Sequence, residues 1–266
     1  MRIRFIALCT GLLILAAPAA AQAKSTITLS GSTSVTPLAS KLAKAYVKTK
    51  RGKVGFKILQ GGSDIGVSDV ARGRVTLGMS SRDPLPTDPG GLRFSRIARD
   101  GVCIATNAGN GIADMSQDTV QAIFSGRIRN WSDVPGAGKS GAIDLVVRNP
   151  ASGTQDAFQN IFMGQNLRVS SSASQRPSNG RVQQAIASNP NAIGYVDFAF
   201  TKGLHTVSYK GIACSLRNAK SGQYGGVRSF WLVSRGAPTG AAAAWIKWIK
   251  SAKARRIIAQ NWVPIK

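Results

Sequence analysis

The sequence has 266 residues, of which 35 are Lys or Arg and 11 are acidic, so its formal net charge at pH 7 is +24. All of the acids are aspartate and His205 is the single histidine, which excludes paired-glutamate hydrolysis and most histidine-based zinc sites. A serine or cysteine nucleophile would have to use His205, which lies in a polar segment with no nucleophile elbow nearby. We therefore expect no enzyme, no catalytic residue, no metal site and no cofactor, although aspartate-based and metal-assisted schemes are not eliminated.

The first 23 residues have the pattern of a secretory signal peptide. Arg2 and Arg4 precede an apolar run that is too short for a permanent membrane anchor, and residues 21–23 match a signal peptidase site. Cleavage after Ala23 would leave 266 − 23 = 243 residues, and the loss of two arginines would change the net charge from +24 to +22. We expect a periplasmic or secreted protein.

Strand-like and helix-like runs alternate along the rest of the chain. We expect strands at residues 26–30, 54–59, 75–79, 102–106, 144–147, 193–196 and 228–233. We expect helices at residues 35–48, 65–72, 117–124, 155–162, 181–187 and, as one long helix, 241–259, with a loop at 84–91. This alternation predicts an α/β fold in which parallel-rich sheets carry helices on both faces, and such sheets bind ligands beyond the carboxyl ends of their strands.

Two cysteines remain after the predicted cleavage, Cys103 and Cys214. In an oxidising compartment they would form one disulfide, whereas two separate buried thiols would pack like small apolar residues. The sequence leaves both alternatives open.

Three segments share one design, in which a β-run ends in glycine and hydroxyl residues just before a helix. They are residues 30–39 (SGSTSVTPLA), 60–67 (QGGSDIGV) and 148–154 (RNPASGT). The first amides of a helix have no intrahelical partner, glycine allows close approach, and hydroxyls add donors, so such a segment suits an anion. Any one of them is also what an ordinary helix cap requires. Together with Arg148, whose fork binds two oxygens, the three segments favour a site for a tetrahedral anion.

In this order, the segments resemble the periplasmic phosphate-binding proteins of ABC importers, the phosphate-type family of solute-binding proteins. The resemblance is carried by residues 31–39 (GSTSVTPLA), 61–67 (GGSDIGV), 78–82 (GMSSR) and 148–158 (RNPASGTQDAF). It is also carried by residues 122–134 (AIFSGRIRNWSDV), 189–200 (NPNAIGYVDFAF) and 221–233 (SGQYGGVRSFWLV). The matching segments cover nearly the whole chain after residue 23.

The resemblance implies a two-lobed periplasmic binding protein fold of type II, with two hinge crossovers between its α/β lobes. It places residues 24–105 and 205–266 in lobe one and residues 106–204 in lobe two. It implies that the chain captures inorganic phosphate in the cleft between the lobes and delivers it to a membrane ABC permease, and we expect a monomer. We expect no nucleic-acid partner, because the sequence has no zinc-ligand spacing, no alternation of basic and aromatic residues and no single-strand-binding signature.

Carried over residue by residue, the resemblance also implies a set of phosphate ligands. They are Thr33, Ser34, Ser63 and Ser81 from lobe one and Arg148, Ser152, Gly153 and Thr154 from lobe two.

Two positions depart from the family pattern. Ser81 stands where family members often carry an aspartate that accepts the proton of hydrogen phosphate. Asp64 is the candidate replacement, unless it only caps its helix, and Asp83 is expected only to begin a turn. Pro150 stands where some members have an acid that pairs with the arginine.

Two further functions stay open. A serine hydroxyl can donate a hydrogen bond as well as accept one, so Ser81 would not repel an anion that lacks a proton. The alternative ligand is therefore sulfate or another tetrahedral oxyanion. The charge of +22 also fits a second alternative, a basic extracellular module that interacts with acidic polymers. On the last predicted helix, Trp245, Ile246, Trp248 and Ile249 have the spacing of a buried face, and a membrane-surface helix shows the same pattern.

Overall fold

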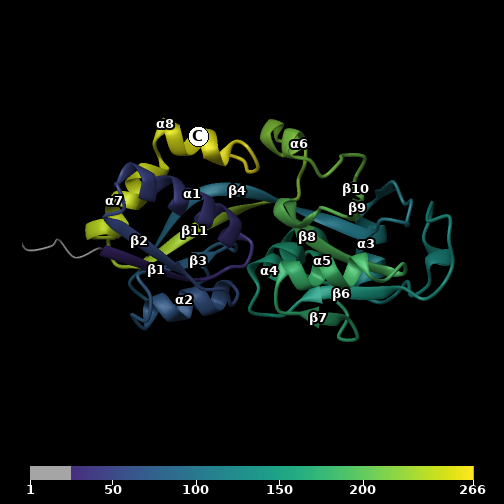
Figure 1. The fold of residues 1–266 in the computed structure, drawn as a ribbon. Helices are drawn as coiled ribbons and strands as arrows, with labels where there is room; N and C mark the ends of the chain where they lie inside the picture. Colours follow the sequence, from purple (N-terminus) through teal and green to yellow (C-terminus); the bar gives the residue numbers. More distant parts are fainter. Residues whose placement is uncertain (1–24, 266) are drawn as a thin grey trace, which may run out of the picture.

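The computed structural model describes residues 25–265, so the predicted signal peptide at 1–23 lies outside the described residues. One continuous sheet passes through both halves of the molecule, with the strand order β2-β1-β3-β11-β4-β8-β6-β7 and with β9 paired to β4 (Figure 1). Over residues 25–265, no helix has the length and apolar character that crossing a membrane requires.

The sheet of lobe one contains β1 (Ser25–Gly31), β2 (Val54–Ile58), β3 (Leu77–Ser80), β11 (Val227–Arg235) and the first part of β4 (Leu92–Asn107). β1 pairs in parallel with β2 and β3, while β11 runs antiparallel between β3 and β4. The carboxyl ends of three parallel strands therefore meet at one edge, which is where such sheets place ligands.

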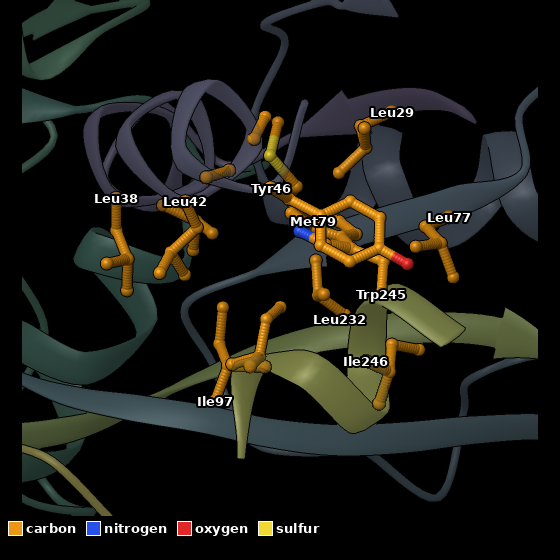
Figure 2. Packing of buried hydrophobic residues seen from close by; sticks show 14 of the residues in the cluster. Leu29, Leu38, Leu42, Tyr46, Leu77, Met79, Ile97, Leu232, Trp245 and Ile246 are labelled. Carbon is orange, nitrogen blue, oxygen red and sulfur yellow. The ribbon is translucent and has the colours of Figure 1, made fainter. Parts of the chain in front are cut away.

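The two faces of this sheet carry different helices. On one face, α1 (Val35–Thr49), α7 (Gly240–Ile249) and α8 (Ala252–Ile258) enclose the core that Figure 2 shows, with Tyr46 and Trp245 packed on Leu77 and Leu232. On the other face, α2 (Ser63–Ala71) packs against Val233. Leu232 and Val233 point to opposite faces because successive strand residues alternate.

The second half of the sheet contains the rest of β4 with β6 (Asp144–Arg148), β7 (Ser174–Arg176), β8 (Ala192–Asp197) and β9 (Leu204–Thr206). Its helices are α3 (Gln117–Phe124), α4 (Gly153–Phe158), which continues as a π-helical turn over Gln159–Met163, and α5 (Asn179–Ala187). β5 (Asp114–Met115) pairs with β10 (Ser208–Tyr209), and α6 (Leu216–Ser221) precedes β11. Single 3-10 turns occupy Trp131–Asp133 and Phe198–Phe200.

The strand pairings and the core contacts indicate where the chain crosses between the two halves. β4 pairs with β11 up to Gly101 and with β8 from Val102 onward. Val207, Tyr209 and Tyr224 all pack in the core of the second half, although the prediction assigned everything after residue 204 to lobe one. We propose that the second crossing between lobes lies near residues 226–227.

A disulfide joins Cys103 on β4 to Cys214, with their Cα atoms 5.6 Å apart. Cys214 precedes α6, so the bond fastens the segment between β10 and α6 to the central strand. Of the two alternatives left open by the sequence, the structure contains the bridge.

The secondary structure departs from the sequence prediction in two of the predicted elements, and the prediction did not include β5, β7, β9, β10 or α6. The single helix expected at 241–259 is wrong, because α7 ends at Ile249 and Ser251 caps a separate helix by accepting a hydrogen bond from the Ala254 amide. The strand expected at 102–106 is only the second part of β4, which begins at Leu92. The first part is masked because Arg93, Arg96 and Arg99 recur every third residue, which does not match the two-residue period of a strand.

Candidate anion-binding site

The hydroxyl groups of lobe one gather at the carboxyl-terminal edge of its parallel strands. Thr33 and Ser34 connect β1 to α1, Ser63 begins α2, and Ser81 follows β3. All four residues are buried. The Ser81 hydroxyl accepts a hydrogen bond from Ser32 at 2.8 Å and lies 3.3 Å from the Ser63 hydroxyl, so the predicted lobe-one ligands form one cluster.

Arg148 ends β6 in lobe two and is 2% exposed. Its guanidinium donates to the backbone carbonyls of Arg176 at 3.2 Å and Pro177 at 3.0 Å, and within residues 25–265 no carboxylate lies within ion-pair distance of it. Burial lowers the pKa of Arg148 to about 10, against the opposing effects of Tyr195 and Asp197. Carbonyl oxygens thus orient this cation, and its charge is left for a ligand to balance.

Residues 152–154 form the turn that leads into α4. The Ser152 hydroxyl caps the helix by accepting from the Thr154 and Gln155 amides. Gly153 lies against lobe one so closely that a Cβ there would be 2.4 Å from the Ser63 hydroxyl and 2.7 Å from the Arg82 amide nitrogen. Glycine is therefore required at this position for the two lobes to meet in this way.

Direct contacts join the two sets of predicted residues across the cleft. The hydroxyls of Ser34 and Thr154 are 3.0 Å apart, and Arg148 Nη1 donates to the Thr33 hydroxyl at 3.2 Å. The structure therefore brings Thr33, Ser34, Ser63, Ser81, Arg148, Ser152, Gly153 and Thr154 together in one buried polar site.

Three residues that the sequence prediction missed complete this site. Arg228, on β11, donates to the Ser34 hydroxyl at 2.8 Å and to the Ser81 hydroxyl at 3.3 Å. Asn179, the first residue of α5, donates to the hydroxyls of Thr33 and Ser34 at 3.1 and 2.8 Å. Asp197, at the end of β8, accepts from Asn179 at 3.0 Å and pairs with Arg228 at 3.2 Å.

The sequence contained a usable signal for two of these residues. Asp197 ends a run of apolar residues and glycine that is buried throughout, and Arg228 interrupts an otherwise largely apolar strand. Charged side chains are rarely buried unless they are paired or functional. The signal for Asn179 is weak, because an asparagine beside a serine cap is common at helix starts.

Arg228 lies between two buried carboxylates, Asp197 and Asp100, the latter 3.8 Å away. Burial raises the pKa of Asp100 well above its ordinary value, and the Asp197 charge raises it further. Burial also raises the pKa of Asp197, although Arg228 opposes this, and burial lowers the pKa of Arg228. Within the described residues, neither oxygen of Asp100 and only one oxygen of Asp197 has a hydrogen-bond partner.

The other aspartates near the site are engaged elsewhere. Asp64, the predicted proton acceptor, pairs with Arg82 Nε at 2.7 Å, and its side chain is 49% exposed. Asp83 accepts a hydrogen bond from the Trp231 indole at 3.0 Å. Asp197 accepts a hydrogen bond from Asn179 in the buried cluster, whereas Asp100 reaches Arg228 only at 3.8 Å and Asp64 faces a different cation. The described part of the chain also contains no group of three or more His, Cys, Asp or Glu side chains that would hold a metal ion.

The molecule has two α/β lobes, and a buried set of guanidinium, amide and hydroxyl donors lies where the lobes meet. This arrangement is typical of solute-binding proteins. The chain belongs to the PBP superfamily, since the model of the PBP superfamily domain matches residues 16–253. The family and the two-lobed α/β fold predicted from the sequence are confirmed.

Individual relatives agree with this assignment. The phosphate-binding protein PstS of Bacillus subtilis is 28% identical over 255 residues, which span 92% of this chain and 82% of that protein. A phosphate ABC transporter substrate-binding protein from Clostridium perfringens, solved with bound phosphate, superimposes with a TM-score of 0.85 at 29% identity and covers 91% of this chain and 100% of its own. An ABC-type phosphate transport receptor from Vibrio cholerae has the same fold, with a TM-score of 0.72 at 24% identity over 90% of this chain and 100% of its own.

Proposed function

We propose that this chain captures inorganic phosphate between its two lobes and delivers it to the membrane permease of an ABC transporter. The observation that carries the proposal is the convergence of two buried guanidinium groups, Arg148 from lobe two and Arg228 from lobe one, on a shared cluster of hydroxyls. Fork-shaped cations and neutral donors together match the oxygens of a tetrahedral anion. The names of the Bacillus and Clostridium relatives support the same ligand.

Binding couples to closure of the lobes because neither lobe holds the whole donor set. Thr33, Ser34 and Arg228 belong to lobe one, whereas Arg148 and Gly153 belong to lobe two. An ion that contacts both sets favours the closed form, since only there do all donors meet it. A transporter can then distinguish loaded from unloaded protein by shape. We infer that the chain works as a monomer, in the periplasm or outside the cell, and that it releases its ligand unchanged.

We infer that Asp197 accepts the proton of hydrogen phosphate. Its unpartnered oxygen is buried, and its other oxygen is held by Asn179 and Arg228, both of which contact the Ser34 hydroxyl. An ionised carboxylate only accepts hydrogen bonds, so it pairs with a protonated anion and repels one without a proton. Phosphate retains a proton near neutral pH, whereas sulfate does not.

Sulfate or another tetrahedral oxyanion is the second candidate ligand, and Ser81 is the observation that favours it. The Ser81 hydroxyl receives hydrogen bonds from Ser32 and Arg228, so this part of the site is rich in donors and has no carboxylate of its own. If Asp197 does not face the ligand, such surroundings accept sulfate as readily as phosphate.

Calorimetric titration with phosphate, arsenate, sulfate and molybdate decides between the ligands. We expect one phosphate per chain, weaker sulfate binding and no turnover. The Arg148→Ala variant should lose at least ~2 kcal/mol of phosphate binding, because hydrogen bonds to charged groups contribute about 1.5–3 kcal/mol each. Arg168→Ala, which removes an exposed arginine of the same lobe, is the matched control. Tighter binding of sulfate, or unchanged phosphate affinity in Arg148→Ala, would overturn the proposal.

A further inference from the structure

Positive charge is concentrated on one face of lobe one. Residues 25–63 and 198–265 contain no aspartate and no glutamate. These segments supply α1, α7 and α8, which contact one another on the same face of the sheet (Figure 1). Eleven exposed cations lie on these helices and on the turn after α1: Lys41, Lys44, Lys48, Lys50, Arg51, Lys53, Lys247, Lys250, Lys253, Arg255 and Arg256. We call this set the basic face.

The acids of lobe one lie elsewhere. Asp64 and Asp69 are on α2, which covers the opposite face of the sheet, and Asp83 and Asp88 are in the loop after β3. The remaining acid of lobe one, Asp100, is fully buried. Within residues 25–265, no cation of the basic face takes part in an ion pair. The charge of this face is therefore balanced by nothing in the described part of the protein.

We propose that the basic face docks the protein on the surface of an anionic phospholipid bilayer. Eight of its eleven cations are lysines, which act as mobile point charges and suit a diffuse sheet of negative charge. Clusters of four to eight Lys or Arg on helices are typical of binding to anionic lipids. Trp248 lies half-buried among Lys247 and Lys250, where an amphipathic ring would meet the headgroup layer.

The composition of the face argues against two other occupants. A surface for single-stranded nucleic acid would offer several aromatic rings for base stacking, whereas Tyr46, Trp245 and Trp262 are buried under this face and only Trp248 is partly exposed among these four aromatic residues. A specific protein interface would combine apolar anchors with charges of both signs, and this face has no acid. A surface whose charged side chains are all cationic fits a partner whose negative charge is spread evenly over its surface.

Docking through this face leaves the anion-binding site open. α1 begins beside Ser34 in the site and ends at Thr49, and 15 residues of helix are about 22 Å long. The cations at residues 48–53 therefore lie at the far end of the helix from the cleft. A protein held in this way remains close to a membrane while its ligand exchanges.

Co-sedimentation with lipid vesicles tests the proposal. The purified mature chain should bind vesicles of phosphatidylcholine mixed with phosphatidylglycerol, should not bind phosphatidylcholine alone, and should dissociate as sodium chloride is raised. The triple variant Lys247→Gln, Lys250→Gln, Lys253→Gln should bind the anionic vesicles at least about tenfold more weakly, because each lysine near such a surface contributes separately. Glutamine forms helices well, so the variant should keep the fold, and unchanged phosphate binding verifies this.

A control with the same loss of charge separates this face from net charge. Arg168→Gln, Lys202→Gln, Lys210→Gln removes three exposed cations that lie in the second half of the molecule and should retain nearly wild-type vesicle binding. Equal weakening of the two triple variants would overturn the proposal, because only the total charge would then matter. Absence of binding to anionic vesicles would overturn it too, as would binding to a soluble polyanion such as heparin with the same dependence on Lys247 but no binding to vesicles.

Discussion

Arg148 and Arg228 reach one hydroxyl cluster from opposite lobes, and they differ in how their charges are balanced. Arg228 has Asp197 at 3.2 Å and Asp100 at 3.8 Å, whereas Arg148 is oriented by two backbone carbonyls. Removing a buried cation from water is costly unless an anion compensates it. A bound anion would therefore offset the free-energy cost of burying Arg148.

At the level of single residues, we predict that Asp197→Asn removes discrimination between phosphate and sulfate. The amide keeps the shape of the side chain but adds a donor, so a hydrogen phosphate loses its acceptor and a sulfate gains a partner. The ratio of the two affinities, measured by calorimetry, should shift by at least about tenfold, which corresponds to one or more hydrogen bonds to a charged group.

Asp64→Asn is the matched comparison for this variant. The Asp64 carboxylate is paired with Arg82, so we expect the affinity ratio to stay at its wild-type value. A shift in Asp64→Asn, with none in Asp197→Asn, would instead support the acceptor predicted from the sequence.

We also predict that Asp100→Asn raises the thermal stability at neutral pH. Asp100 is fully buried, and burial raises the pKa of its carboxyl group in the folded state. The carboxyl group of Asp100 therefore loses its proton at a lower pH in the unfolded chain, near the ordinary pKa of an aspartate, than in the folded chain. Between these two pKa values the unfolded state binds fewer protons, so wild-type stability falls as pH rises. Asparagine does not ionise and avoids this loss.

Thermal unfolding in a series of buffers from pH 4 upward measures the effect, because the ordinary pKa of a carboxyl group lies at the lower end of this series. The Tm of Asp100→Asn minus that of the wild type should grow as pH rises from about 4 and then level off. The difference should reach about 2–4 °C if ionisation of Asp100 lowers the free energy of unfolding of the wild type by about 1 kcal/mol. Asp133→Asn, at an exposed position, serves as the control. A constant or shrinking difference would contradict the expected titration.

At the level of elements, the start of α4 sets how closely the lobes meet. We predict that Gly153→Ala weakens phosphate binding about tenfold or more, because its Cβ would fall 2.4 Å from the Ser63 hydroxyl and overpacking costs about 1–3 kcal/mol. Lobe two should fold normally, because the clash arises only on closure. Calorimetry should report the loss, and Gly111→Ala, whose Cβ meets no atom within 4 Å, should bind as the wild type does. Wild-type affinity in Gly153→Ala would show that the lobes bind without this contact.

The elements also show what the sequence could and could not predict. The apolar pattern placed β1, α1, α3 and β8 to within a residue or two, because β1, α1 and α3 each have an apolar face, β8 is an apolar run that is buried throughout, and Ser116 caps α3. The break at Ser251 was missed because both flanking helices share one apolar spacing, and a single serine cap divides them. The first part of β4 was missed because its arginines recur every third residue and hide the two-residue period of a strand.

The site could be predicted only as far as local motifs reach. Gly- and Ser-rich turns identify Thr33, Ser63 and Ser152, because helix starts carry their own signature. Arg228 and Asp197 lie on strands without such a turn, where the sequence shows each only as a charge beside apolar residues, and only the tertiary fold brings them within 3.2 Å of each other. Their role depends on which strands become neighbours at the hinge, and local sequence does not specify this.

At the level of the whole molecule, β4 and β11 join lobes whose own cores are separate. The clusters around Trp245 and around Phe158 each belong to one half of the sheet. Two independent cores with two connecting segments suit rigid lobes that open and close about a hinge. The two faces of lobe one also differ in charge, since α2 carries Asp64 and Asp69 whereas α1, α7 and α8 carry cations that no acid within residues 25–265 pairs with.

The central claim is that a single tetrahedral oxyanion is held by both lobes at once. A crystal structure of the chain with arsenate tests it most directly, because the anomalous signal of arsenic locates the ion without reference to any assumed site. The account predicts one strong peak, placed so that the oxygens of this arsenate accept hydrogen bonds from Ser34, Arg148 and Arg228. A peak bound to one lobe alone, or located away from these residues, would contradict the account.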